Sequence, residues 1–204
     1  MASIPSRIRS HPHDDFMTDG NAGLLASAKR GDSAALSALL EAHLAMVYRF
    51  VGLKVGPDSP DLDDIVQETL IGAARSMGSF HGTTDAQVAG WMLSIARHKI
   101  ADHLRARYHR REESMIEGGA VVADPAVPVD TLVAARDRAA RIRQELARLT
   151  PEQEEVLTLR FLLGFEIREV AEITHRPEGA VKSLQHRALA SLQKRLGPER
   201  AEWT

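Results

Sequence analysis

Apolar residues recur three and four positions apart in most segments of the chain, and this spacing restricts the possible folds more than any other feature. In an α-helix, residues at these spacings share one face, which is then available for burial. No segment shows the strict alternation of apolar and polar residues that predicts a half-buried strand. We therefore predict an all-α fold. The two clearest stripes are Leu36, Leu39, Leu40, Leu44, Val47 and Val51, and then Val181, Leu184, Ala188, Leu192 and Leu196.

Capping signals divide this pattern into separate helices. Asp32 or Ser33 can cap a helix over residues 33–52, and Ser59 with Pro60 favours the start of another. Thr150, followed by a proline and then by Gln153, is a capping box that opens a helix ending near residue 164. Further helices are expected at 85–111, 131–149, 166–174 and from 178 onward, with a loop at 78–84.

Two segments lack any sustained period. Residues 112–130, "EESMIEGGAVVADPAVPVD", contain glycines, prolines and acids, a composition typical of a linker. Residues 1–20 are polar and favour a disordered tail, in which a metal site at His11 and His13 is the weaker interpretation. The predicted organisation is a tail at 1–20, one domain at 21–112, a flexible linker at 113–135 and a second domain at 136–204.

Composition excludes several classes of protein. The absence of cysteine excludes disulfides, zinc ribbons and iron–sulfur clusters, and we expect no metal or cofactor. We expect no apolar run to approach the roughly 20 residues of a membrane helix, and the N-terminus lacks the apolar core of a signal peptide. A soluble, cytoplasmic protein without membrane insertion is therefore expected.

A short helix, a tight turn and a longer helix with a basic outer face lie near the C-terminus. This order is typical of a helix-turn-helix, in which the second helix enters the major groove of DNA. An ordinary helical hairpin with a solvated basic face would give the same pattern. The candidate DNA-reading residues are Glu178, Lys182, Ser183, Gln185, His186 and Arg187.

The helix expected at 85–111 changes character along its length. It begins with apolar residues such as Trp91 and Leu93, whereas residues 97–111 contain six Arg or Lys, three His and one Asp. Such a segment can neutralise phosphates of a nucleic acid. The alternative is a solvated helix end, where cations also favour the helix dipole.

Acids concentrate before and within the helix that follows Pro60. Asp64 and Glu68 share one helix face, close to Asp61 and Gln67. A catalytic or metal-binding pair is the less favoured interpretation, because no Glu-x-x-His helix, phosphate-binding loop or nucleophile elbow accompanies it. The favoured interpretation is an acidic surface that is solvated or that binds a partner protein.

These three features, in this order, resemble the extracytoplasmic-function (ECF, group IV) sigma factors of bacterial RNA polymerase. "DLDDIVQETLIGAARSMGSF" is similar to region 2.2 of that family, and "GWMLSIARHKIADHLRAR" to regions 2.3 and 2.4. "LTPEQEEVLTLRFLLGFEIREVAEITHRPEGAVKSLQHRALASL" is similar to region 4. The fold implied is a region 2 bundle and a region 4 helix-turn-helix, joined by the linker.

The resemblance implies that the chain binds core RNA polymerase, through its β′ clamp helices and β flap, and promoter DNA, under the control of an anti-sigma factor. The polymerase would perform the chemistry, so the chain itself is not expected to be an enzyme. The implied polymerase contacts are Asp61, Asp64, Gln67 and Glu68. The implied −10 contacts are Phe80, His81, Arg97, His98, Lys99, Asp102, Arg105, Arg107 and Tyr108. The implied −35 contacts are Arg168, Glu178, Lys182, Ser183, Gln185, His186 and Arg187. The alternative is a conventional helix-turn-helix transcription regulator, whose first domain serves for dimerisation or sensing.

The sequence departs from the family pattern at three places. His98 replaces the usual Asn, and "AQVAG" precedes Trp91 where an aromatic residue and an Arg are common. "VKSLQHRA" replaces V-K-S-R-L-H-R-A. Because Leu184 is three residues after Val181, we expect Leu184 to face the core and Gln185 to face outward.

Overall fold

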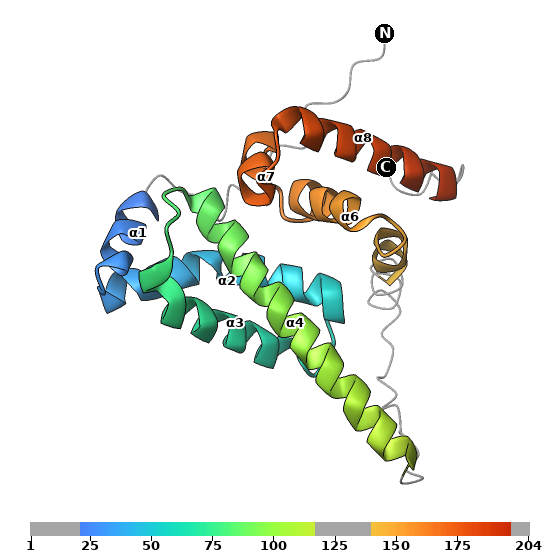
Figure 1. Cartoon of the computed structure of the whole chain (residues 1–204), viewed down its shortest axis with the longest axis horizontal. Helices are drawn as coiled ribbons and strands as arrows, with labels where there is room; N and C mark the ends of the chain where they lie inside the picture. Colours follow the sequence, from blue (N-terminus) through green and yellow to red (C-terminus); the bar gives the residue numbers. More distant parts are fainter. Residues whose placement is uncertain (1–20, 117–139, 197–204) are drawn as a thin grey trace, which may run out of the picture.

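The structure is a computed structural model, and it describes residues 21–116 and 140–196, with side chains at 23–108 and 140–195 (Figure 1). Within those ranges every regular element is helical and no strand occurs. The predicted all-α class is thereby confirmed. The expected tail and most of the expected linker lie outside the described residues.

The first helical group contains α1 (Asn21–Lys29), α2 (Ser33–Val55), α3 (Leu62–Ser76), the short 3₁₀ turn η1 (Met77–Ser79) and α4 (Asp85–Ile116). Asp32 caps α2 as predicted, because its carboxylate accepts hydrogen bonds from the backbone N–H groups of Ala34 and Ala35 at 2.9 and 3.1 Å. Figure 1 shows α4 crossing the group diagonally, with its C-terminal end projecting beyond the other helices.

Helix α2 supplies much of the interior of this group. Leu39, Val47 and Val51 are fully buried, and they pack with Ile65 of α3 and Leu93 of α4. By length and composition α2 could cross a membrane, which corrects our expectation that no run is long enough. The structure uses its apolar residues as the core of a helical bundle.

The second helical group follows Thr150 and its capping box. It contains α6 (Pro151–Leu157), the π-helical turn η2 (Thr158–Leu162), α7 (Ile167–Thr174) and α8 (Glu178–Leu196), preceded by helical residues 140–146. The predicted capping box is present, with both hydrogen bonds between Thr150 and Gln153. His175 ends α7 in the left-handed conformation (φ 54°), which produces the tight turn before α8.

Several local predictions were wrong. Helix α1 was not predicted, and α3 begins at Leu62 because Ser59 and Pro60 form a turn before it. In that turn Ser59 Oγ accepts from the backbone N–H of Asp61 at 3.3 Å. Helix α4 continues to Ile116, into the segment assigned to the linker. The helix predicted to run from Pro151 to Gly164 changes from α to π geometry after Leu157.

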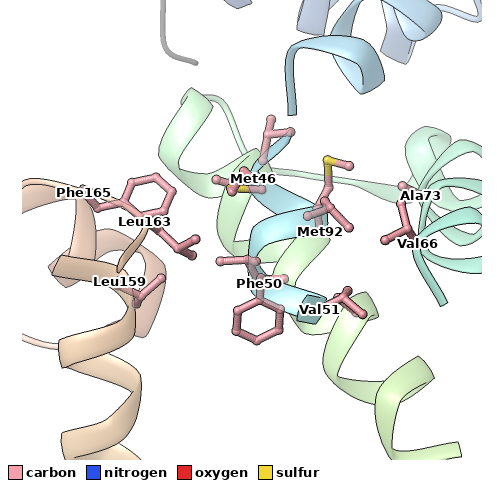
Figure 2. Close-up of a cluster of buried hydrophobic side chains, with 14 of the residues drawn as sticks. Met46, Phe50, Val51, Val66, Ala73, Met92, Leu159, Leu163 and Phe165 are labelled. Carbon is pink, nitrogen blue, oxygen red and sulfur yellow. The ribbon is translucent and has the colours of Figure 1, made fainter. Parts of the chain in front are cut away.

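The two groups pack against each other through α6, η2 and α7 on one side and α2 and α4 on the other. Leu159, Leu163 and Phe165 belong to the same buried apolar cluster as Met46 and Phe50 of α2 (Figure 2). The interior is therefore continuous across the two groups, which the sequence had not indicated.

Candidate nucleic-acid and partner-binding surfaces

The predicted acidic surface on α3 divides into exposed and paired residues. Asp64 and Gln67 are exposed on the helix. Glu68 instead lies 3.2 Å from Lys99 Nζ and 3.6 Å from His103 Nε2, both on α4. Asp61 lies 3.8 Å from Arg107 Nη1. The structure therefore pairs acids predicted to bind polymerase with cations predicted to bind DNA.

Asp63, which lies beside this surface, accepts a hydrogen bond from the Tyr48 hydroxyl at 3.0 Å. This hydrogen bond, aided by slight burial and by the negative charge of Asp63, raises the pKa of Tyr48 above its ordinary value of 10.0. The bond fixes the start of α3 against the middle of α2.

The C-terminal half of α4 presents the exposed cations that the sequence predicted. Arg105 and Arg107 are 69% and 64% exposed, and Tyr108 is 63% exposed beside them. Asp102 pairs with Arg105 at 2.6 Å, one helical turn away. These guanidinium groups remain open to solvent on one side, so they can reach phosphate oxygens.

Further back on α4, two predicted residues make contacts that restrict them. The Arg97 guanidinium lies 2.6 Å from Glu155 of α6 and is 40% exposed. His98 is exposed, and its Nδ1 lies 2.7 Å from the carbonyl oxygen of Ser94. Because a carbonyl can only accept, Nδ1 is the donor in this contact and Nε2 is left for other partners.

The loop before α4 is organised around an aromatic stack. The Phe80 ring lies 4.6 Å from the Trp91 ring, centroid to centroid, at an interplanar angle of 26°. The Lys29 ammonium lies 5.2 Å from the Phe80 centroid and donates to the carbonyl of Gly82. A Cβ at Gly82 would overlap the Phe80 ring, so only glycine permits this packing. His81, also predicted, is exposed.

Lys29 was missed by the sequence analysis because it lies in α1, more than 50 residues before the loop. Its cation–π contact and its hydrogen bond both depend on tertiary packing, and no local motif marks it. The structure thus adds one cation to the predicted site.

The second group forms the predicted helix-turn-helix from α7 and α8. Arg168 is exposed on α7, and Lys182, Ser183, His186 and Arg187 are exposed on α8. Glu178 and Lys182 lie 3.5 Å apart, one turn from each other. This surface presents cationic donors, a hydroxyl, an imidazole and one carboxylate at helical spacing, which are side-chain types able to contact base edges and phosphates.

The orientation predicted around residue 184 is correct for one residue and wrong for its neighbour. Leu184 is 8% exposed and faces the core, as expected. Gln185 is half-buried, and its Oε1 is buried without a hydrogen-bond partner, so it does not face outward as predicted.

A surface hollow joins the start of α7 to the start of α8. Its charged lining residues are Arg160, Glu166, Arg168, Glu178 and Lys182. Three of these residues were predicted, whereas Arg160 of η2 was not. Arg160 donates to the backbone carbonyl of Phe165, which fixes its position in the lining. Within the described residues, no group of three or more potential metal ligands occurs.

Comparisons with known proteins divide the chain in the same way. The family model "Sigma-70 region 2" matches residues 39–110, and the model "Sigma-70, region 4" matches residues 139–192.

Individual relatives match across most of the chain. The ECF RNA polymerase sigma factor SigM of Mycobacterium tuberculosis is 32% identical over 177 residues, covering 87% of this chain and 85% of SigM. The ECF RNA polymerase sigma factor BldN of Streptomyces coelicolor is also 32% identical, covering 85% of this chain but 64% of BldN. Among solved structures, that of CnrH in complex with the cytosolic domain of CnrY matches with a TM-score of 0.60 and 25% identity, covering 87% of this chain and 97% of CnrH.

Proposed function

Since this chain belongs to the ECF RNA polymerase sigma factors of the sigma-70 family, we propose that it binds core RNA polymerase and directs it to promoters with −10 and −35 elements. The observation that carries this proposal is the presence of two separate cationic surfaces on one chain. One includes Arg105 and Arg107 of α4, and the other includes Lys182 and Arg187 of α8. A conventional helix-turn-helix regulator would need only the second.

The −10 element is assigned to α4 and to the loop before it. Arg105 and Arg107 supply phosphate contacts, which fix the DNA without reading its sequence. The Phe80–Trp91 stack offers an aromatic face on which an unpaired base can stack, a contact worth about 1–3 kcal/mol per base. That stacking offsets part of the cost of separating the strands. His98, with Nε2 free of the contact that Nδ1 makes to Ser94, belongs to the same proposed set.

The −35 element is assigned to α8, which enters the major groove with Lys182 and Arg187 directed at base edges and phosphates. Arg168 of α7 lines the same hollow as the start of α8. It is assigned a contact with the DNA backbone of the −35 element. Glu178, Ser183, Gln185 and His186 complete the proposed set. The half-buried position of Gln185 makes it the weakest base reader among them.

Polymerase binding is assigned to the exposed acids of α3, with Asp64 and Gln67 as the centre. An acidic surface complements the basic β′ clamp helices, and charge complementarity of this kind sets register and association rate. Asp61 and Glu68 belong to the same surface, and their pairing with α4 links polymerase binding to the DNA-binding helix. Region 4 would contact the β flap. The nucleotide chemistry remains with the polymerase, in the cytoplasm.

An anti-sigma factor is proposed as a further partner. CnrH, the solved structure of similar fold, is in complex with the cytosolic domain of CnrY. A protein that covers both helical groups of this chain would block the α4 and α8 surfaces together.

The decisive experiment is in vitro transcription with core RNA polymerase and fragmented DNA of the source genome. We expect promoter-specific initiation that requires this protein. Duplex binding at a palindrome by the protein alone, with no initiation on any fragment, would contradict the proposal and favour the conventional regulator.

A further inference from the structure

Two consecutive acids of α6 reach across to the first helical group. Glu154 forms an ion pair with Lys54 near the end of α2, and Glu155 lies 2.6 Å from Arg97 of α4. Both carboxylates are only 26% exposed. Ion pairs at this depth are screened less by solvent than pairs on an open surface.

The two cations also share a single aromatic ring. The Arg97 guanidinium lies 5.6 Å and the Lys54 ammonium 5.9 Å from the centroid of Phe50, a side chain that is 2% exposed. Both distances are within the range of cation–π attraction. Each cation is therefore held between the ring of one helical group and a carboxylate of the other.

The contacts around these pairs are close and specific. Thr84 Oγ1 donates to Glu172 of α7 at 2.9 Å. At Gly90 of α4, a methyl group in place of the hydrogen would meet Ile173 of α7, with atoms at 3.1 to 3.3 Å. Together with the continuous apolar cluster in Figure 2, these contacts keep region 4 closed against region 2.

This closed arrangement conflicts with promoter binding. The −10 and −35 elements are about 25 base pairs apart, which is roughly 85 Å at the 3.4 Å rise of duplex DNA. The helices assigned to them are joined in the closed chain by direct packing of α4 on α7 and of α7 on α8. In addition, Glu155 already takes one edge of the guanidinium of Arg97, a residue assigned to the −10 element.

We propose that Glu154 and Glu155 are an intramolecular substitute for DNA phosphates, which latches region 4 onto region 2 and masks Arg97 in the free chain. Carboxylate and phosphate oxygens present similar acceptors to a guanidinium, so a strand of DNA and α6 compete for the same cation. The masking half of this inference rests on the proposed −10 role of Arg97, whereas the latch itself does not. Promoter affinity of the free chain is then reduced by the fraction of molecules that are closed.

Closure can be measured without DNA. The chain has no cysteine, so Ala26→Cys on α1 and Ala190→Cys on α8, both at exposed positions, accept a dye pair without background labelling. Energy transfer between the dyes should fall in Glu155→Gln and in Lys54→Glu. It should recover when Lys54→Glu is combined with Glu154→Lys, because the pair is then restored with its charges exchanged.

Masking is measured with the full chain and a fluorescein-labelled single-stranded DNA 20-mer of mixed sequence. Glu155→Gln should bind this probe about threefold to tenfold more tightly than the matched control Glu152→Gln, as expected for loss of one partly buried ion pair. The control removes the same charge from the same helix, where Glu152 interacts with its own backbone, with Thr150 and with Arg176, all within the second helical group.

The outcomes separate the two halves of the inference. Unchanged energy transfer in both Glu155→Gln and Lys54→Glu would overturn the latch. Lower energy transfer with no gain in DNA affinity over Glu152→Gln would overturn the masking of Arg97. A failure to support transcription would refute the proposed function and leave the energy-transfer result standing, since that measurement contains neither DNA nor polymerase.

Discussion

Gly90 offers a way to open the chain by steric means alone. It lies inside α4, and the three atoms nearest to a Cβ built on it all belong to Ile173 of α7, at 3.1, 3.3 and 3.3 Å. Normal contacts between carbon atoms are about 3.5–4.0 Å, so a methyl group must push Ile173 away by a few tenths of an ångström. Replacement of Gly90 therefore acts on the docking of α7.

The sizes of the opposing effects give the expected sign. Inside a helix, replacing glycine by alanine stabilises by about 0.5–1 kcal/mol, whereas overpacking a tight contact costs typically about 1–3 kcal/mol. Gly90→Ala should consequently weaken docking only slightly. Gly90→Leu directs three more carbon atoms at Ile173, so docking should be lost while α4 itself keeps the gain in helix propensity.

The assay measures energy transfer between dyes on α1 and α8. Circular dichroism of the same samples measures helix content. We expect Gly90→Leu to reduce energy transfer and to leave helix content unchanged, with Gly90→Ala close to the parent. Adding Ile173→Ala should recover part of the closed form. Undiminished energy transfer in Gly90→Leu would refute the steric argument, and a large loss of helix content would show that Gly90 is needed within region 2 itself.

Three further predictions concern the first helical group. Asp64→Arg should weaken binding to core polymerase by about threefold to tenfold without changing −35 DNA binding by the same chain, as measured by fluorescence anisotropy. Glu68→Lys should also lower the free energy of unfolding by up to about 1 kcal/mol, seen in urea titration, because it places a cation beside Lys99. The raised pKa means that Tyr48 loses its proton at higher pH than an ordinary tyrosine. In an ultraviolet titration, the absorbance change at the highest pH should therefore vanish in Tyr48→Phe and move to lower pH in Asp63→Asn.

The fold was predictable wherever local signals were strong. The Thr150–Gln153 capping box and the Asp32 cap depend on neighbours within three residues, and both are present as predicted. The start of α3 was misplaced because Ser59 and Pro60 are equally suited to a turn and to a first helical turn. Nothing in the sequence marks the change to π geometry after Leu157, since it depends on how η2 packs.

The candidate site was predictable in its exposed residues but not in its pairings. Arg105, Lys182 and Arg187 are exposed because they lie opposite apolar stripes that the sequence displays. Lys29 could not be found this way, because its contacts with Phe80 and Gly82 arise only after distant segments pack. The same limitation applied to His43, a buried residue of α2 whose Nε2 lies 3.4 Å from Asp85.

The sequence was least informative about Arg97, because an arginine can bind a DNA phosphate or a protein carboxylate equally well. A basic residue within a predicted DNA-binding helix was interpreted through the partner that the family implies, and the start of α6 was interpreted only as a capping box of Thr150 and Gln153. Both interpretations are local, and both leave out that Glu155 and Arg97 meet when the two helical groups close. On our proposal the closed chain and the DNA-bound chain are alternatives, because Glu155 holds one edge of the Arg97 guanidinium in the closed chain and DNA would take its place. The Glu154–Lys54 and Glu155–Arg97 pairs then bias the balance between the two states.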